Sequence, residues 1–264
     1  MWFQWSVLGL ISAITLPLSN FQESTPKQDS EYTTAGADVA SDVPLKNAQV
    51  NMTGTMLASK TPRKDLDATI RSMQSQYENT KSFSTSFTQR YTYTMLRKTQ
   101  VSQGQATYMK PGRIKWSYTS PARKSFIVND GKLWVDQPEE NLVMVDNCFK
   151  EDSLTASLSF LWGSANLKEQ FRIEWFNGTF GDSTDLHLLL FPLQPQNMFS
   201  KLILVLDPKT YRVKQSIVVD PQGNVNQFIY QNTEYNLELS GRDFDFTPPS
   251  TSVVSRMPGS CVKK

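Results

Sequence analysis

The sequence predicts a mainly β protein with helices (α+β), organised as a curved antiparallel sheet or open barrel of about 10–11 strands with helices against one face. Three observations predict this class. Runs of alternating apolar and polar residues recur from residue 83 onward. Turn residues separate these runs, such as Pro-Gly at 111–112, Ser-Pro at 120–121 and Asn-Asp-Gly at 129–131. Only two or three stretches have helical spacing, which is too few for a parallel sheet covered by helices on both faces.

The N-terminal 22 residues contain no charged side chain. Within them, Val7–Leu18 is an apolar run as long as the core of a signal peptide and shorter than a helix that spans a bilayer. We therefore interpret residues 1–19 as a signal peptide; an uncleaved N-terminal anchor and a buried structural segment are the alternatives. Residues 20–62 are polar without an apolar period, and we interpret them as a flexible linker.

A folded domain is expected over residues 63–250, and it begins with an amphipathic helix. Apolar residues spaced for one helix face predict a helix within residues 63–81. They are Leu66, Ile70, Met73 and Tyr77. The period then changes to two, which predicts a long half-buried strand over residues 83–95. Its large side chains share one face: Phe83, Phe87, Tyr91, Tyr93 and Met95.

Residues 104–145 are the most informative stretch, a predicted meander of antiparallel strands joined by tight turns. Ile114, Trp116 and Tyr118 alternate with polar or charged residues, so they point to one face of the sheet. A later run at 142–145 is apolar on both faces. A large aromatic face is unfavourable in water, so another layer of the protein or a ligand must cover it.

The second half of the domain repeats this pattern after one predicted helix, Glu151–Trp162, with Ser153 as its candidate N-cap. A further short helical turn is possible at 165–169. Strands are expected at residues 171–176, 186–191, 201–206, 211–220, 225–236 and 244–246. The C-terminal tail, residues 251–264, is expected to be irregular.

The composition argues against several classes of function. The chain has 27 Lys and Arg against 25 Asp and Glu, a net charge of +2, so nothing indicates nucleic acid as a partner. The single histidine, His187, lies in an apolar strand without a second ligand at metal-binding spacing, and is interpreted as structural. Gly-Asp-Ser at 181–183 is similar to the start of a lipase signature, but its place between two strands favours a turn. We expect no metal, no cofactor and no catalytic centre.

Cys148 and Cys261 are the only cysteines in the chain. In an exported protein an even pair favours one disulfide, which would attach the C-terminal tail to the middle of the domain. Two unrelated thiols are the alternative.

Five motifs along the domain carry a family resemblance. They occupy residues 81–89, 110–116, 126–134, 159–163 and 244–249, and they read KSFSTSFTQ, KPGRIKW, FIVNDGKLW, SFLWG and FDFTPP. In this order they resemble the periplasmic outer-membrane lipoprotein carrier proteins, the LolA family, over about residues 65–250. The resemblance implies an incomplete, strongly curved antiparallel β-barrel with a helical lid that encloses a hydrophobic cavity.

The resemblance also implies a function. It implies a monomeric periplasmic carrier or chaperone that takes lipidated lipoproteins from an inner-membrane ABC transporter toward an outer-membrane acceptor. Shielding is needed because each acyl methylene transferred to water costs about 0.8 kcal/mol. The expected acyl-chain cavity residues are Phe87, Tyr91, Tyr93, Ile114, Trp116, Tyr118, Leu133, Met144, Leu158 and Leu161.

The resemblance further implies that Lys110, which occupies a position where many members have arginine, is a latch that holds the lid shut. An ordinary solvated lysine is the alternative. Two other functions remain open at this stage. One is a different lipid-binding or envelope-sensing module on the same half-barrel fold, which would bind free phospholipid or one protein partner. The other is a hydrolase, which would require turnover that depends on Ser183.

Overall fold

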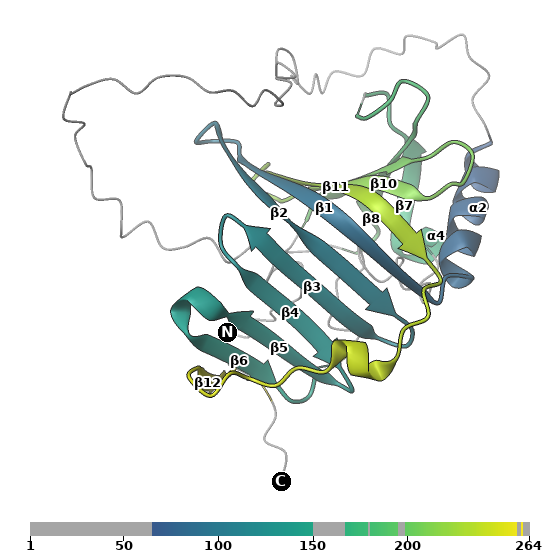
Figure 1. Ribbon diagram of the computed structural model, residues 1–264. Helices are drawn as coiled ribbons and strands as arrows, with labels where there is room; N and C mark the ends of the chain where they lie inside the picture. The colour runs from purple at the N-terminus through teal and green to yellow at the C-terminus, as the bar shows by residue number, and fades with distance from the viewer. Residues whose placement is uncertain (1–64, 150–166, 179, 195–198, 258–259, 261–264) are drawn as a thin grey trace, which may run out of the picture. The chain divides into compact units, whose positions relative to one another are not determined.

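The computed structural model describes residues 65–149, 167–178, 180–194, 199–257 and 260. This part of the chain forms one long, curved and open sheet of 12 strands in the order β12-β6-β5-β4-β3-β2-β1-β11-β10-β9-β8-β7 (Figure 1). Every neighbouring pair is antiparallel except β12 and β6, which run parallel. The expected mainly β class with a curved, unclosed sheet is therefore confirmed.

The strands divide into two halves that meet between β1 and β11. The first half contains β1 (Ser82–Tyr93), β2 (Lys98–Met109), β3 (Arg113–Ser120), β4 (Lys124–Asn129), β5 (Lys132–Gln137), β6 (Leu142–Asp146) and β12 (Val253–Arg256). The second half contains β7 (Phe171–Trp175), β8 (Leu186–Pro192), β9 (Lys201–Leu206), β10 (Val213–Val219) and β11 (Val225–Tyr235). The described helices are α2 (Leu66–Glu78), α4 (Leu167–Gln170), η2 (Pro138–Glu140) and η4 (Gly241–Phe244).

Helix α2 forms where the apolar spacing predicts it. Its N-cap is Asp65, whose side chain accepts a hydrogen bond from the backbone N–H of Asp67. Ile70, Met73 and Tyr77 are its large buried side chains. The Tyr77 hydroxyl accepts a hydrogen bond from the backbone N–H of Val213 at 3.1 Å, which joins the end of the helix to the start of β10.

Two predicted segments near the C-terminus differ from the structure. The motif around Phe244 is a 3-10 turn and not a strand, because Ser240 and Asp243 form a reciprocal capping box that starts η4. The tail is not wholly irregular, since β12 pairs with β6 at the edge of the sheet.

One predicted strand is shorter than expected. The strand over 83–95 ends earlier, at Tyr93, because the chain turns there into β2.

Several expectations lie outside the described residues. They are the signal peptide at 1–19, the linker at 20–62, the start of the domain at 63–64 and the helix at 151–162. These stay predictions.

The second half of the sheet carries a small apolar cluster on the face opposite the aromatic residues of β1 and β3. Ile203, Val205 and Ile217 are buried there, and side chains from the connection between β7 and β8 pack against them. That connection includes Phe176 and Phe180, whose rings stack at 5.8 Å. This loop therefore acts as a second layer over β8, β9 and β10.

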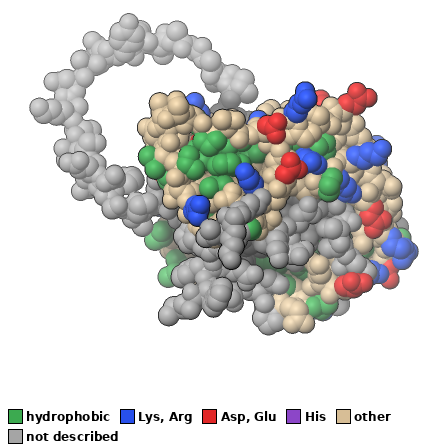
Figure 2. All heavy atoms as spheres, turned by 90° about the horizontal axis from the view of Figure 1, so that it is seen from below, with side chains coloured by type: hydrophobic (Ala, Val, Ile, Leu, Met, Phe, Trp, Pro, Cys, Tyr) green, Lys and Arg blue, Asp and Glu red, His purple; other side chains and the backbone are tan. Residues whose placement is uncertain are grey.

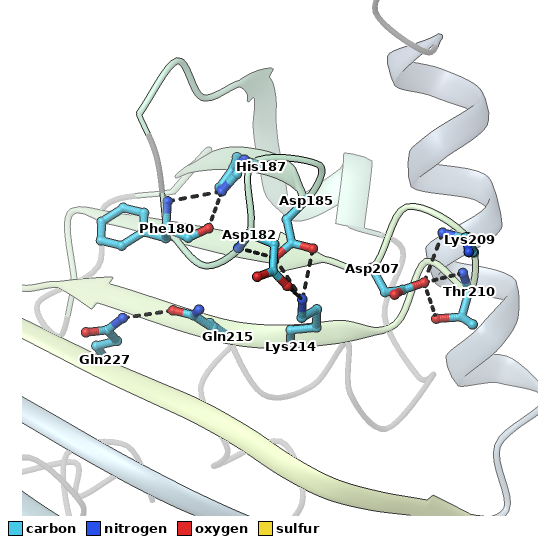
Figure 3. Close-up of polar contacts among 10 residues, drawn as sticks. All are labelled: Phe180, Asp182, Asp185, His187, Asp207, Lys209, Thr210, Lys214, Gln215 and Gln227. Carbon is cyan, nitrogen blue, oxygen red and sulfur yellow. Dashed lines mark hydrogen bonds and ion pairs between the residues drawn. The ribbon is translucent and has the colours of Figure 1, made fainter. Parts of the chain in front are cut away.

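Polar contacts hold the same loop in place (Figure 3). The Nε2 of His187 lies 2.7 Å from the carbonyl oxygen and 3.2 Å from the backbone nitrogen of Phe180. Lys214 on β10 pairs with Asp182 at 2.6 Å and with Asp185 at 3.0 Å. His187 is thus a structural strand residue, and Ser183 belongs to a turn that the backbone N–H of Asp185 closes by donating to the carbonyl oxygen of Asp182.

Removal of the Asp185 carboxylate should destabilise the fold, because its side chain is only 2% exposed and is paired to Lys214. We expect Asp185→Ala to lower the free energy of unfolding by about 1–3 kcal/mol in urea denaturation. Asp182→Ala is the matched control, since Asp182 binds the same lysine with a side chain that is 76% exposed. Its effect should stay at about 0.5 kcal/mol or less. Equal losses in the two variants would contradict this account.

Candidate functional site

The candidate site is one face of the first half of the sheet. Residues directly opposite each other in an antiparallel pair share a face. Trp116 lies opposite Ala106 on β2 and opposite Phe126 on β4. Phe126 in turn lies opposite Val135, which lies opposite Met144 on β6. This register defines what we call the aromatic face.

Eight of the predicted cavity residues lie on the aromatic face by this register. They are Phe87, Tyr91, Tyr93, Ile114, Trp116, Tyr118, Leu133 and Met144. The remaining two, Leu158 and Leu161, lie outside the described residues. The sequence therefore places these side chains on a common surface, while their contact with acyl chains stays a prediction.

The centre of this face is a cluster of rings around Phe87. The ring of Phe87 lies 4.7 Å from Trp116, 5.2 Å from Tyr118 and 5.8 Å from Phe228 on β11. Trp116 and Phe228 meet edge to face at 5.3 Å, and Phe228 stacks on Tyr230. The two sheet halves are thus joined by aromatic packing as well as by the ladder of β1 and β11.

Gly104 makes this cluster possible. It lies on β2, directly between Phe87 on β1 and Tyr118 on β3. A Cβ at this position would lie 2.1 Å from the backbone oxygen of Ser117 and 2.6 Å from Cζ of Phe87. The Phe87 ring can therefore cross β2 to reach Trp116 only because residue 104 has no side chain.

Polar groups also lie among the rings of the aromatic face, and burial governs their chemistry. Trp116 Nε1 and the Tyr118 hydroxyl oxygen are buried without a hydrogen-bond partner among the described residues. Tyr118 as a whole is half-buried, but burial of its hydroxyl raises its pKa. Burial also raises the pKa of Tyr91 to about 12 and lowers that of Lys124 to about 8. The face is therefore a low-polarity environment.

Lys124 is a site residue that the sequence reasoning missed. It lies opposite Tyr118, on the aromatic face, and its ammonium is 5.7 Å from the centre of the Phe126 ring. Its place in the alternation, two residues before Phe126, was the available signal. Trp134, by contrast, lies on the opposite face, where its ring is 5.7 Å from Phe246.

Lys110 follows β2 and binds the end of helix α2. Its Nζ donates hydrogen bonds to the carbonyl oxygens of Tyr77 at 2.8 Å and Glu78 at 3.0 Å. The last turn of α2 has no basic residue of its own, so Lys110 supplies the positive charge that the helix C-terminus favours. Burial lowers the pKa of Lys110, and the nearby Glu78 carboxylate opposes this. Lys110 is therefore not an ordinary solvated lysine, and its role as a lid latch stays a prediction.

The C-terminal segment approaches the residues that follow β6. Cys148 has no free thiol. The backbone N–H of Asn147 donates to Oγ of Ser260 at 3.2 Å. Cys261 lies outside the described residues, so its pairing with Cys148 stays a prediction.

No group of three or more His, Cys, Asp or Glu side chains among the described residues could hold a metal ion. Within the same part of the chain, no helix is long and apolar enough to cross a membrane.

Comparison with known proteins agrees with the motifs. The family model described as outer membrane lipoprotein carrier protein LolA matches residues 78–247. A relative named outer-membrane lipoprotein carrier protein from Methylibium petroleiphilum is 27% identical over 169 residues, covering 64% of this chain and 79% of its own. One of the same name from Dechloromonas aromatica is 25% identical, covering 67% and 82%. A LolA superfamily protein structure from Nitrosomonas europaea matches with a TM-score of 0.37 at 10% identity, covering 70% and 99%.

A methyl group at position 104 should disturb the aromatic cluster. We expect Gly104→Ala to lower the free energy of unfolding by about 1–3 kcal/mol, because Phe87 must move away from β2. Gly241→Ala is the control, since the nearest atom to its Cβ would be Nε of Arg113 at 3.5 Å, an ordinary contact. Urea denaturation followed by tryptophan fluorescence measures both. A Gly104→Ala variant as stable as the control would show that Phe87 does not need this space.

Removal of the Lys110 amine should loosen the end of helix α2. We expect Lys110→Met to cost roughly 1 kcal/mol and to speed amide hydrogen exchange in the last turn of the helix. Lys110→Arg should retain most of the protection. Lys209→Met, at an exposed position in the β9–β10 turn, is the control. Unchanged exchange in Lys110→Met would rule out a role in holding the helix.

Proposed function

The chain belongs to the outer membrane lipoprotein carrier (LolA) family, and from this premise we propose that it is a periplasmic carrier that shields the acyl chains of lipidated proteins. The observation that carries the proposal is the aromatic face, on which eight residues expected from the sequence lie in one register. Large apolar side chains from neighbouring strands lie together on this face. Binding of apolar chains is the chemistry that such a surface can perform.

The proposed mechanism is reversible burial without covalent chemistry. Acyl chains would lie against the rings of Phe87, Trp116 and Phe228. On binding, these rings would lose part of their contact with one another and gain contact with the methylene groups of the chains. Each methylene removed from water contributes about 0.8 kcal/mol, so several chains provide enough free energy to hold a cargo. Because no bond forms, release requires only a surface that binds the chains more tightly. A membrane or an acceptor protein in the outer membrane can provide it.

The helix predicted at 151–162 is the proposed lid, with Leu158 and Leu161 toward the chains. Lys110 supports this proposal indirectly, because it already binds a helix terminus beside β2. An ABC transporter in the inner membrane is the proposed donor of the cargo. The protein is proposed to act as a monomer and to need no cofactor.

A release assay tests the function. Purified protein is added to spheroplasts that hold a newly lipidated outer-membrane lipoprotein, and the supernatant is examined for a soluble complex. We expect release of the lipidated protein and no binding of the same protein made without its lipidated cysteine. Release of neither form, or capture of both equally, would contradict a carrier that recognises acyl chains. Co-purification of free phospholipid instead would favour a different lipid-binding function on this fold.

Trp116 provides a local test of the acyl-binding face. We expect Trp116→Phe to weaken binding of a fluorescent fatty acid by roughly three- to tenfold, because about 1 kcal/mol of apolar contact is lost. Trp134→Phe is the matched control, since this indole lies on the opposite face against Phe246. It should leave probe affinity unchanged. Thermal unfolding of both variants separates the loss of binding from the loss of stability, and equal probe affinity in the two variants would overturn the assignment of the face.

A further inference from the structure

The hairpin between β1 and β2 carries an apolar tip that the proposed cargo site does not use. The turn spans Thr94 to Arg97, and it lies at the upper left of Figure 1. Met95 is 89% exposed and Leu96 is 61% exposed. Isolated exposed apolar residues are ordinary on protein surfaces, but two adjacent long aliphatic side chains at the end of a hairpin are not. Val101, on the same hairpin, is a third exposed apolar residue.

The tip is held firmly in position. The backbone N–H of Thr94 donates to Oδ1 of Asn224 at 3.1 Å, and the Thr94 hydroxyl donates to the carbonyl oxygen of Gly223 at 2.6 Å. Across the hairpin, the hydroxyls of Thr92 and Thr99 are 2.9 Å apart. The turn between β10 and β11 thus braces the hairpin up to Thr94. The rest of the turn, Met95 to Arg97, extends beyond the brace.

The hairpin is positively charged. Residues 82–109, from the start of β1 to the end of β2, contain three Lys and Arg residues and no Asp or Glu, although the whole chain is nearly neutral. Arg90, Arg97 and Lys98 lie on the hairpin, and among the described residues none of them forms an ion pair. On the side of the molecule seen from below, away from the tip, both basic and acidic side chains occur (Figure 2).

One acidic group lies near the base of the tip. Asp220 raises the pKa of Tyr91, after the larger effect of burial. Its carboxylate oxygens accept hydrogen bonds from the backbone and side chain of Asn224, both at 2.8 Å. Asp220 therefore belongs to the brace, and three basic residues against this single carboxylate leave the hairpin cationic.

We propose that the β1–β2 hairpin docks on the surface of a bilayer that contains anionic phospholipid. Met95 and Leu96 would enter the boundary between headgroups and acyl chains, while Arg97 and Lys98 bind phosphate groups beside them. Exposed aliphatic side chains next to basic ones fit this surface because it offers hydrocarbon and negative charge within a few ångströms of each other. The docking does not depend on what binds the aromatic face.

Vesicle flotation tests the proposal. The full chain is mixed with vesicles of phosphatidylcholine and phosphatidylglycerol, or of phosphatidylcholine alone, at low and high salt. The variant Met95→Ser, Leu96→Ser is compared with Val253→Ser, Val254→Ser, which removes two apolar residues that are 67% and 51% exposed at the edge strand β12. All variants keep the same N-terminal residues, so a difference between them reports the hairpin.

We expect the hairpin variant to bind the anionic vesicles about tenfold more weakly than the wild type, while the β12 variant binds normally. High salt or pure phosphatidylcholine should reduce wild-type binding, because both remove the electrostatic contribution. Near-ultraviolet circular dichroism checks that each variant is folded. Equal vesicle binding by both double variants would overturn the proposal. If the hairpin variant lost cargo delivery in cells but bound vesicles as the wild type does, this result would also overturn the proposal. It would indicate a protein partner at the tip. The affinity of the hairpin variant for the fluorescent fatty acid is measured as well. An unchanged affinity would show that weaker vesicle binding is not caused by damage to the aromatic face.

Discussion

The passage of one aromatic ring over a strand without a side chain is the constraint on which the rest of the structure depends. Phe87 on β1 crosses β2 at Gly104 and packs against Trp116 on β3, while Phe228 on β11 closes the other side. These contacts make β1 the common element of both sheet halves. The continuity of the aromatic face follows from this packing, in which Trp116 and Phe228 also meet each other edge to face. On the same face, burial raises the pKa of Tyr91 and lowers that of Lys124.

Polar side chains attach helix α2 and the β7–β8 connection to the sheet. Lys110 binds the carbonyl end of α2, and Tyr77 accepts a hydrogen bond from the start of β10. On the opposite face, Lys214 and Asp185 hold the β7–β8 connection over its own small apolar cluster. In each case a polar side chain provides a hydrogen-bond or ion-pair partner for backbone or carboxylate groups at the edge of an apolar layer. Polar residues therefore determine where the covering elements lie, and apolar residues provide the free energy.

Much of the fold and part of the site could be predicted from the sequence because strand periodicity is a local property. Alternation placed Ile114, Trp116 and Tyr118 on one face, and helical spacing placed α2. What failed depends on interactions that composition and periodicity do not reveal, some local and some between distant parts of the chain. The motif at Phe244 has the composition of a strand, but the Ser240–Asp243 capping box takes its backbone into a 3-10 turn. Strand β12 forms only because β6 offers an edge, which a tail of ordinary composition does not reveal. Lys124 and Trp134 could have been assigned to opposite faces by parity alone, whereas the donation from Lys110 to α2 required the tertiary structure.

The ladder between β1 and β11 has a consequence for how the molecule is made. Phe87 pairs with Tyr230, a partner more than half the chain away, whereas β1 and β2 are consecutive. Synthesis from the N-terminus therefore yields β1 to β6 as a meander of local pairings before β11 exists. Until β11 arrives, β1 is an open edge with an exposed row of aromatic residues, which is a surface prone to association with other chains. The late pairing of β11 converts this temporary edge into the centre of the sheet, so the most vulnerable strand during synthesis becomes the best protected one in the finished protein.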